Sequence, residues 1–190
     1  MKDLFNSTVC LALVAALAAC GGSSSSDSNA STRCGAASGN TVLAGTVTAV
    51  HDGDTLTLTT DTTTEHIRLQ GIDAPELAQP FGDNARLALS QQTLRQSVRV
   101  AYTQRDRYDR ILGQVFTSNC VDVNQQLLNL GMAWFYKAYA CDLEKPRRTR
   151  YEAAHAQAMA QGLGLWSQHL PLAPWIFRNG EDPPSPSCAD

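Results

Sequence analysis

Residues 41–70 read TVLAGTVTAVHDGDTLTLTTDTTTEHIRLQ, and this stretch decides the fold class. It contains three segments that are rich in β-branched residues and alternate in hydrophobicity, which predicts strands at 41–50, 55–60 and 65–70. Asp52-Gly53 is typical of the tight turn of a hairpin between the first two strands. The stretch therefore predicts a three-stranded antiparallel meander.

The remaining segments predict two further strands and a set of helices. The strands are expected at 98–103 and 111–117, on either side of a charged turn. Helices are expected at 81–95, at 123–130 and from Pro146 to about residue 161. This order of elements predicts an α+β domain, a five-stranded OB-fold-like Greek-key β-barrel with about three α-helices.

The charge of the chain is unevenly distributed. The 190 residues carry a net charge of −3, which on its own argues against a nucleic-acid partner. Residues 40–85, however, contain one Arg and seven acids, whereas residues 86–150 contain eleven Lys or Arg and five acids. Such a division suits a cation site beside a phosphate-binding surface, and an uneven solvated surface is the alternative.

The first 40 residues are expected to serve export. The apolar run from Val9 to Ala19 is too short to span a bilayer and has the length of a signal-peptide core. It ends in Leu17-Ala18-Ala19-Cys20-Gly21, which resembles a bacterial lipoprotein box, although an ordinary signal peptide with a chance Cys is the alternative. We therefore expect a signal peptide at 1–19, an acylated Cys20 with a flexible tether at 20–40, a folded domain at 41–178 and a C-terminal tail at 179–190. The protein would be lipid-anchored to the cell envelope, at the outer membrane in a Gram-negative cell, or released outside the cell.

Four cysteines remain after export and lipidation, and an even number in an oxidising compartment predicts two disulfides. The preferred pairing joins Cys120 to Cys141 and Cys34 to Cys188, because the second bond would tie the two ends of the domain together. The other two pairings stay open. No Cys-x-x-Cys is present and the His residues are scattered, so zinc is not expected.

Three acids are expected to converge at one edge of the meander. Asp54 follows the first hairpin turn, and Asp73 and Glu76 lie in the loop after the third strand. The start of strand two and the end of strand three meet at the same edge of an antiparallel pair. Oxygen ligands without His or Cys favour calcium or magnesium. Alternatively, these acids are ordinary turn and helix-cap residues.

Arginines supply the second half of the predicted site. Arg68 lies on the third strand, and the turn 105–110 (RDRYDR) gathers Arg side chains around Tyr108. Planar guanidinium groups bind phosphate oxygens through two parallel hydrogen bonds. A solvated hairpin tip with local ion pairs is the alternative. Tyr136 and Tyr139 are candidate stacking faces for bases, or else members of the core.

Together these motifs resemble the staphylococcal nuclease family. They are VHDGDT at 50–55, IRLQGIDAPE at 67–76, DRYDR at 106–110, LGMAW at 130–134 and GLWS at 164–167, and the resemblance spans roughly residues 42–168. It implies a calcium ion (Ca2+) bound by Asp54, Asp73 and the backbone carbonyl of Ala74. It also implies that Glu76 activates or positions the attacking water and that Arg68 and Arg110 clamp the reacting phosphate.

Further contacts to the nucleic acid are implied for Arg107, Tyr108 and Tyr139. Two positions depart from the family pattern: Asp109 stands where a Gly is usual, and Lys137 stands where a second nucleotide-facing Tyr would be. The resemblance implies a calcium-dependent nuclease, expected to be a monomer, that cuts DNA, with RNA as a second candidate substrate. The rivals are an OB-fold nucleic-acid-binding module without catalysis and a surface lipoprotein with a structural calcium.

Overall fold

The computed structural model describes residues 34, 40–184 and 186–188. Five strands form a closed barrel in the order β1-β2-β3-β6-β5, in which β3 and β6 are parallel and the other pairs are antiparallel. The strands are β1 (Thr41–Val50), β2 (Thr55–Thr59), β3 (Thr64–Leu69), β5 (Ser97–Arg105) and β6 (Ile111–Thr117). The predicted OB-fold-like barrel is confirmed, and each predicted strand end lies within two residues of the observed one.

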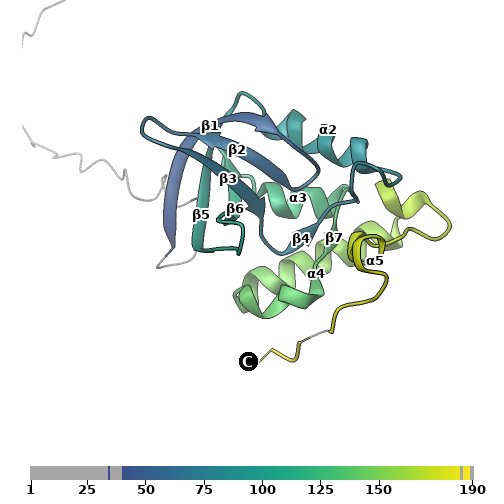
Figure 1. Ribbon diagram of the computed structural model, residues 1–190. Coiled ribbons are helices and arrows are strands. Elements are labelled where there is room, and N and C mark those ends of the chain that lie inside the picture. The colour runs from purple at the N-terminus through teal and green to yellow at the C-terminus, as the bar shows by residue number, and fades with distance from the viewer. Residues whose placement is uncertain (1–33, 35–39, 185, 189–190) are drawn as a thin grey trace, which may run out of the picture.

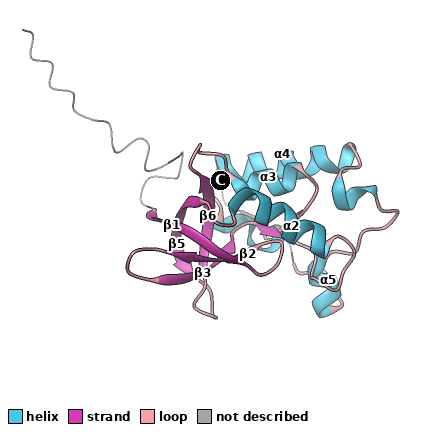
Figure 2. Ribbon diagram, turned by 90° about the horizontal axis from the view of Figure 1, so that it is seen from above, coloured by secondary structure: helices cyan, strands magenta, loops and turns pink. Residues whose placement is uncertain are grey.

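Helices cover one side of the barrel (Figures 1 and 2). The α-helices are α2 (Gly82–Thr93), α3 (Val123–Asn129), α4 (Lys145–Ala160) and α5 (Pro174–Asn179), and the 3-10 helices are η1 (Lys137–Asp142) and η2 (Gly164–Ser167). The sequence predicted α2, α3 and α4. It did not predict α5 or the small sheet of β4 (Ile72–Asp73) and β7 (Trp134–Phe135), because elements this short carry no periodicity. Within the described ranges, no helix has the length and apolar character needed to cross a membrane.

A buried asparagine joins the barrel to the helical layer. Asn124 of α3 accepts a hydrogen bond from the Val115 N–H (3.0 Å) and donates to the carbonyls of Gln70 and Gly113 (3.0 Å each). Its side chain is fully buried, and the Gly113 carbonyl also accepts from the Gln70 N–H (2.9 Å), so these bonds tie the end of β3 to β6 and α3. The end of β3 is thereby fixed against β6, and this fixes where the following loop with Asp73 begins.

The structure corrects the preferred disulfide pairing. Cys34 is bonded to Cys120 and Cys141 to Cys188, with Cα–Cα distances of 4.9 and 5.1 Å. Cys34 lies beside β5, where the Arg99 guanidinium donates to its Sγ (3.1 Å), and the neighbouring strand β6 leads into the turn that carries Cys120. The preferred pairing rested on tying the two ends of the domain together, and this criterion does not reflect the neighbourhood of β5 and β6.

The signal peptide at 1–19, Cys20 and all of the tether except Asn40 and Cys34 lie outside the described residues.

Candidate active site

Asp54 and the end of β3 meet as the hairpin register predicts. Thr55 pairs with Arg68, and the Leu69 N–H donates to the Asp54 carbonyl (2.8 Å). The turn before Asp54 is tight because the Asp54 N–H donates to Oδ1 of Asp52 (2.9 Å). Gly53 is required there, since a Cβ at this position would lie 2.5 Å from the Cβ of Ala74. The hairpin turn is therefore pressed directly against the loop after β3.

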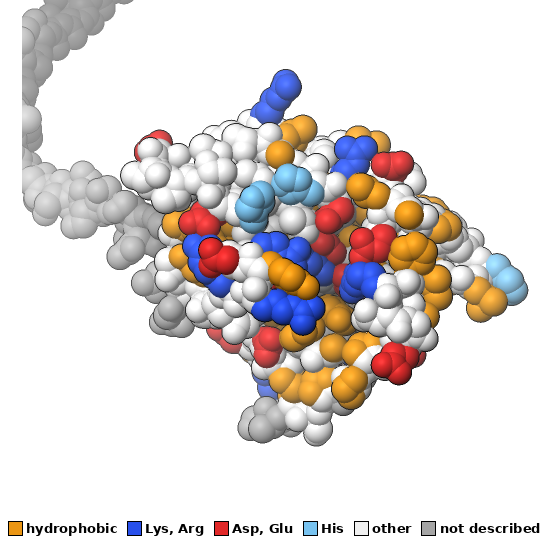
Figure 3. All heavy atoms as spheres, in the orientation of Figure 1, with side chains coloured by type: hydrophobic (Ala, Val, Ile, Leu, Met, Phe, Trp, Pro, Cys, Tyr) orange, Lys and Arg blue, Asp and Glu red, His pale blue; other side chains and the backbone are white. Residues whose placement is uncertain are grey.

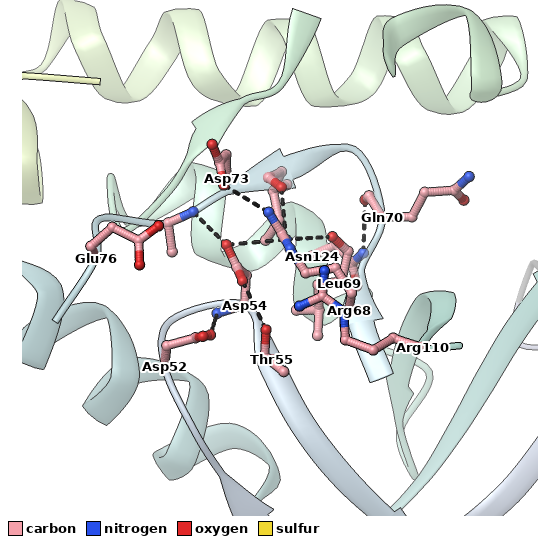
Figure 4. Close-up of polar contacts among 12 residues, drawn as sticks. Asp52, Asp54, Thr55, Arg68, Leu69, Gln70, Asp73, Glu76, Arg110 and Asn124 are labelled. Atoms are coloured by element: carbon pink, nitrogen blue, oxygen red, sulfur yellow. Dashed lines mark hydrogen bonds and ion pairs between the residues drawn. The ribbon is translucent and has the colours of Figure 1, made fainter. Parts of the chain in front are cut away.

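The short strand β4 brings the second acid to the same point. Asp73 pairs with Trp134 of β7, which fixes the backbone of the loop. The next residue, Ala74, donates its N–H to Oδ2 of Asp54 (2.6 Å). Asp54 and Asp73 are 5% and 1% exposed. Two carboxylates from separate loops are thus buried side by side, as the sequence predicted (Figure 4).

Arg68 lies between these two carboxylates. Its Nη1 is 3.0 Å from Oδ2 of Asp54, and its Nη2 donates to Oδ1 of Asp73 (2.7 Å). It also donates to the carbonyls of Leu69 and Ile72 (3.0 Å each). A single guanidinium with four such contacts is held rigidly, because its planar fork fixes the direction of every N–H.

The buried negative charge of Asp54 is only partly compensated by Arg68. Burial raises the pKa of Asp54 to about 8, and Arg68 offsets this only in part while Asp52 and Asp73 add to it. A divalent cation would favour the ionised form of such a carboxylate. Calcium binds carboxylate and backbone carbonyl oxygens. The buried carboxylates of Asp54 and Asp73 and the carbonyl of Ala74 are of these two kinds, so the residues fit a calcium ion. Across residues 40–184, though, no three His, Cys, Asp or Glu side chains are grouped as a complete metal-ligand set.

We predict that Asp54→Asn changes how stability depends on pH. The pKa of Asp54 is about 8 in the folded protein and near 3.8 when unfolded, so the native state keeps a proton that the unfolded state loses. The stability linked to this proton is fully present below about pH 4 and is lost as pH rises towards about 8. Asparagine has no such dependence. Urea unfolding in chelator should therefore show the stability of Asp54→Asn, relative to wild type, increasing between about pH 4 and pH 8 and levelling off above about pH 8. A constant difference would contradict the assignment.

Glu76 is held by a residue that the sequence analysis did not identify. The Glu76 Oε1 atom is 2.6 Å from Nη1 of Arg178, which lies on α5. Nη2 of Arg178 also donates to Oδ2 of Asp73 (2.7 Å). Burial opposes the charge of Arg178, but its bonds to Asp73 and Glu76 raise its pKa above the ordinary value. A single Arg in a six-residue helix leaves no sequence signal, since only the tertiary packing brings it to the acids.

Arg110 lies on the same side of the barrel as Arg68. β3 and β6 are paired in parallel, with Arg68 opposite Leu112. Arg110 lies two residues before Leu112, so its side chain points to the same face of the sheet as that of Arg68. Figure 4 shows the Arg110 side chain extending from the start of β6 towards this group. Its Nη2 is 2.7 Å from Oδ2 of Asp106, which holds the guanidinium in place.

Asp109 keeps the turn and does not pair with Arg110. Its φ is 64°, in the left-handed region that Asp tolerates better than most residues, so the turn survives without Gly. Its carbonyl accepts from Arg105 Nη1 (2.9 Å), and its side chain lies 3.6 Å from the same guanidinium. The negative charge that replaces the usual Gly is thus directed to Arg105.

The predicted nucleic-acid contacts lie on two separate elements. Tyr108 is 65% exposed, and the guanidinium groups of Arg107 and Arg110 lie 4.9 and 5.5 Å from its ring centroid. Tyr139 of η1 is 53% exposed and contacts the ring of Tyr136, which in turn stacks on Trp175. Figure 3 shows Lys and Arg side chains gathered beside acidic ones on the face turned to the viewer. Arg107 and Tyr108 therefore lie beside Arg110 in the turn before β6, whereas Tyr139 belongs to the aromatic cluster with Tyr136 and Trp175 of α5.

Comparisons with known proteins agree with this geometry. The sequence model of the family described as "Staphylococcal nuclease homologue" matches residues 66–168. An "Uncharacterized endonuclease" of Escherichia coli is 38% identical over 135 residues, which is 71% of this chain and 84% of that protein. One of the same description from Haemophilus influenzae is 38% identical over 71% of this chain and 72% of that protein. A "Micrococcal nuclease" of Shigella flexneri is 36% identical over 70% of this chain and 79% of that protein. On the closed barrel, the paired acids and these matches, the chain belongs to the staphylococcal nuclease family.

Proposed function

We propose that this protein is a calcium-dependent nuclease that hydrolyses phosphodiester bonds in DNA, with RNA as a second substrate to be tested. The observation that carries the proposal is the meeting of Asp54 and Asp73, from two loops, around Arg68, with Glu76 and Arg110 on the same side. The relatives described as endonuclease and micrococcal nuclease support it, and nucleases of this family are generally metal-dependent.

The residues divide the chemistry among them. Asp54, Asp73 and the carbonyl of Ala74 would hold calcium, which when bound offsets the negative charge of the phosphate. Glu76 accepts a proton from the attacking water or orients it. Arg68 and Arg110 donate hydrogen bonds to the phosphoryl oxygens as their charge grows. Family resemblance favours cleavage at the 5′-oxygen, which leaves 3′-phosphates.

Plasmid cleavage tests the proposal directly. Purified protein is incubated with supercoiled plasmid and, separately, with single-stranded RNA, in calcium and in excess chelator. We expect cleavage in calcium, its loss in chelator and its return when calcium is restored. Retarded migration of the plasmid without cleavage in any divalent metal would instead indicate a binding module. Cleavage that persists in chelator would overturn the metal dependence.

We also propose that the protein is exported and acylated at Cys20. The two disulfides support an oxidising compartment. Labelling cells with a fatty-acid analogue should mark the wild-type protein and not Cys20→Ser. Equal labelling of both would contradict the anchor.

A further inference from the structure

The C-terminal segment 169–188 packs against the loop that carries Asp73 and Glu76. The family match ends at residue 168, so this segment lies beyond it. Within the segment, the Leu172 carbonyl accepts a hydrogen bond from Nε2 of Gln79 (3.0 Å). Gln79 in turn accepts from the N–H of Glu76 (2.9 Å). A cavity of about 250 Å³ between loop and segment is lined by Pro75, Gln79, Pro80, Leu170, Leu172 and Phe177 among others.

Aromatic packing and a disulfide hold the segment in place. Trp175 of α5 stacks on Tyr136 with ring centroids 5.3 Å apart and packs edge-on against Trp134 at 5.4 Å. Trp134 is the residue that pairs with Asp73 in the small sheet. After α5, Cys188 is bonded to Cys141 of η1. The segment is therefore fixed non-covalently at α5 and covalently near its end, and the attachment at α5 adjoins Trp134, the partner of Asp73.

Arg178 is the charged end of this packing. Its guanidinium contacts both oxygens of Asp73, at 2.7 Å for Nη2–Oδ2 and 3.3 Å for Nη1–Oδ1. The same Nη1 is 2.6 Å from Oε1 of Glu76. Because a guanidinium is planar, these contacts fix the Glu76 carboxylate relative to the buried Asp73.

Glu76 needs such a partner more than the other acids do. Asp54 and Asp73 are buried and share Arg68, whereas the Glu76 side chain is 36% exposed. Within the described part of the chain, Arg178 is the one side chain in an ion pair with it. A general base must be held within hydrogen-bond reach of its water, and a displacement of about 1 Å can cost about 100-fold in rate.

We propose that Arg178 is a positioning residue of the nuclease site, which holds the carboxylate of Glu76 beside Asp73. The segment 169–188 is thereby part of the active site, attached through Trp175 and the Cys141–Cys188 disulfide. This inference rests on the proposed nuclease function and on the role assigned there to Glu76. It adds a residue, outside the span of the family match, that acts through Glu76 rather than on the substrate.

The test is a double-mutant cycle on the full chain. Steady-state cleavage of a fluorogenic DNA oligonucleotide in saturating calcium is measured for wild type, Arg178→Ala, Glu76→Gln and the double variant. We expect Arg178→Ala to lower kcat by about 10-fold to 100-fold with KM changed by less than about threefold. In the Glu76→Gln background the same change should lower kcat by less than about twofold, because the group it positions is already lost.

Further variants separate positioning from folding. Arg178→Lys keeps the charge and should recover part of kcat. Cys141→Ser with Cys188→Ser leaves Arg178 intact but releases the covalent attachment, and should lower kcat in the same direction by a smaller factor. Arg86→Ala, at an exposed Arg on α2, is the matched control and should keep wild-type kcat. Thermal unfolding and calcium affinity by calorimetry are recorded for every variant.

The outcomes are distinguishable. An active wild type with unchanged kcat in Arg178→Ala overturns the inference alone. So does an equal loss of kcat in the wild-type and Glu76→Gln backgrounds, which would mean that Arg178 acts independently of Glu76. A fall in unfolding temperature or in calcium affinity that accounts for the whole kcat loss would mean a purely structural or ligand-binding role. An inactive wild type with all divalent metals overturns the proposed function itself.

Discussion

Replacing Arg68 with methionine is expected to lower the free energy of unfolding by about 3–5 kcal/mol, because it leaves the buried Asp54 without a cationic partner and the buried Asp73 with Arg178 alone. Asp54 and Asp73 lie 3.0 and 2.7 Å from its guanidinium. Methionine keeps the apolar stem and its packing, so the loss reports the charge. The change is large beside the roughly 5–15 kcal/mol that stabilises a typical domain. Urea unfolding near pH 8 in chelator measures it.

The same substitution should also reduce cleavage by about 10²- to 10³-fold, as for removal of one donor that stabilises transition-state charge. Arg86→Met on the exposed face of α2 is the control, since its ion pair with Asp83 is exposed and worth less than about 1 kcal/mol. The destabilisation should shrink at low pH, where the carboxylates take up protons, and should shrink when Asp54→Asn is added. If Arg68→Met unfolds at the same urea concentration as Arg86→Met, the buried cluster does not depend on Arg68.

The parts of the site that follow from local pattern could be predicted. The alternation of the two segments predicts that β2 and β3 pair as a hairpin, whose turn lies at residues 60–63. The resulting register places Asp54, just before β2, beside the end of β3, and β3 leads to Asp73. Arg68 follows from the same pairing, because it lies opposite Thr55. These contacts join residues that are close along the chain, so the hairpin geometry determines them.

The parts that depend on distant packing could not be predicted. Arg178 reaches Asp73 across 105 residues, carried by a helix of six residues with no amphipathic pattern to reveal it. The disulfide partners are set by which segments the fold brings together, the β5–β6 neighbourhood for Cys34 and Cys120 and η1 with the C-terminal segment for Cys141 and Cys188. The order of the cysteines along the chain does not contain this information. The ion-pair partner of Asp109 could not be predicted from the sequence either. The place of Asp109 in the turn follows from its tolerance of positive φ, but its partner, Arg105 and not Arg110, follows from the fold.

Replacing Glu76 with glutamine is expected to lower kcat by about 10²- to 10⁴-fold, the usual contribution of a positioned general base. Glutamine has the same shape, and its amide oxygen can still accept from Arg178, so the loop should keep its structure. The Glu76 side chain is 36% exposed, so the loss of its negative charge leaves no buried group without a partner. The free energy of unfolding and the affinity for uncleaved DNA should therefore change little. Single-turnover cleavage measures the chemical step apart from binding.

Glu152→Gln, at an exposed position on α4, removes one negative charge without touching the acidic loop and serves as the control. Since DNA is a polyanion, losing any acid raises affinity slightly at low salt, and the control measures this general effect. If kcat falls more in Glu76→Gln than in Glu152→Gln, the difference is caused by the loss of the Glu76 carboxylate from the reaction. Cleavage at the wild-type rate would mean that Glu76 is a turn residue tied to Arg178 for structural reasons only. The proton would then have to leave the attacking water by a route that does not involve Glu76.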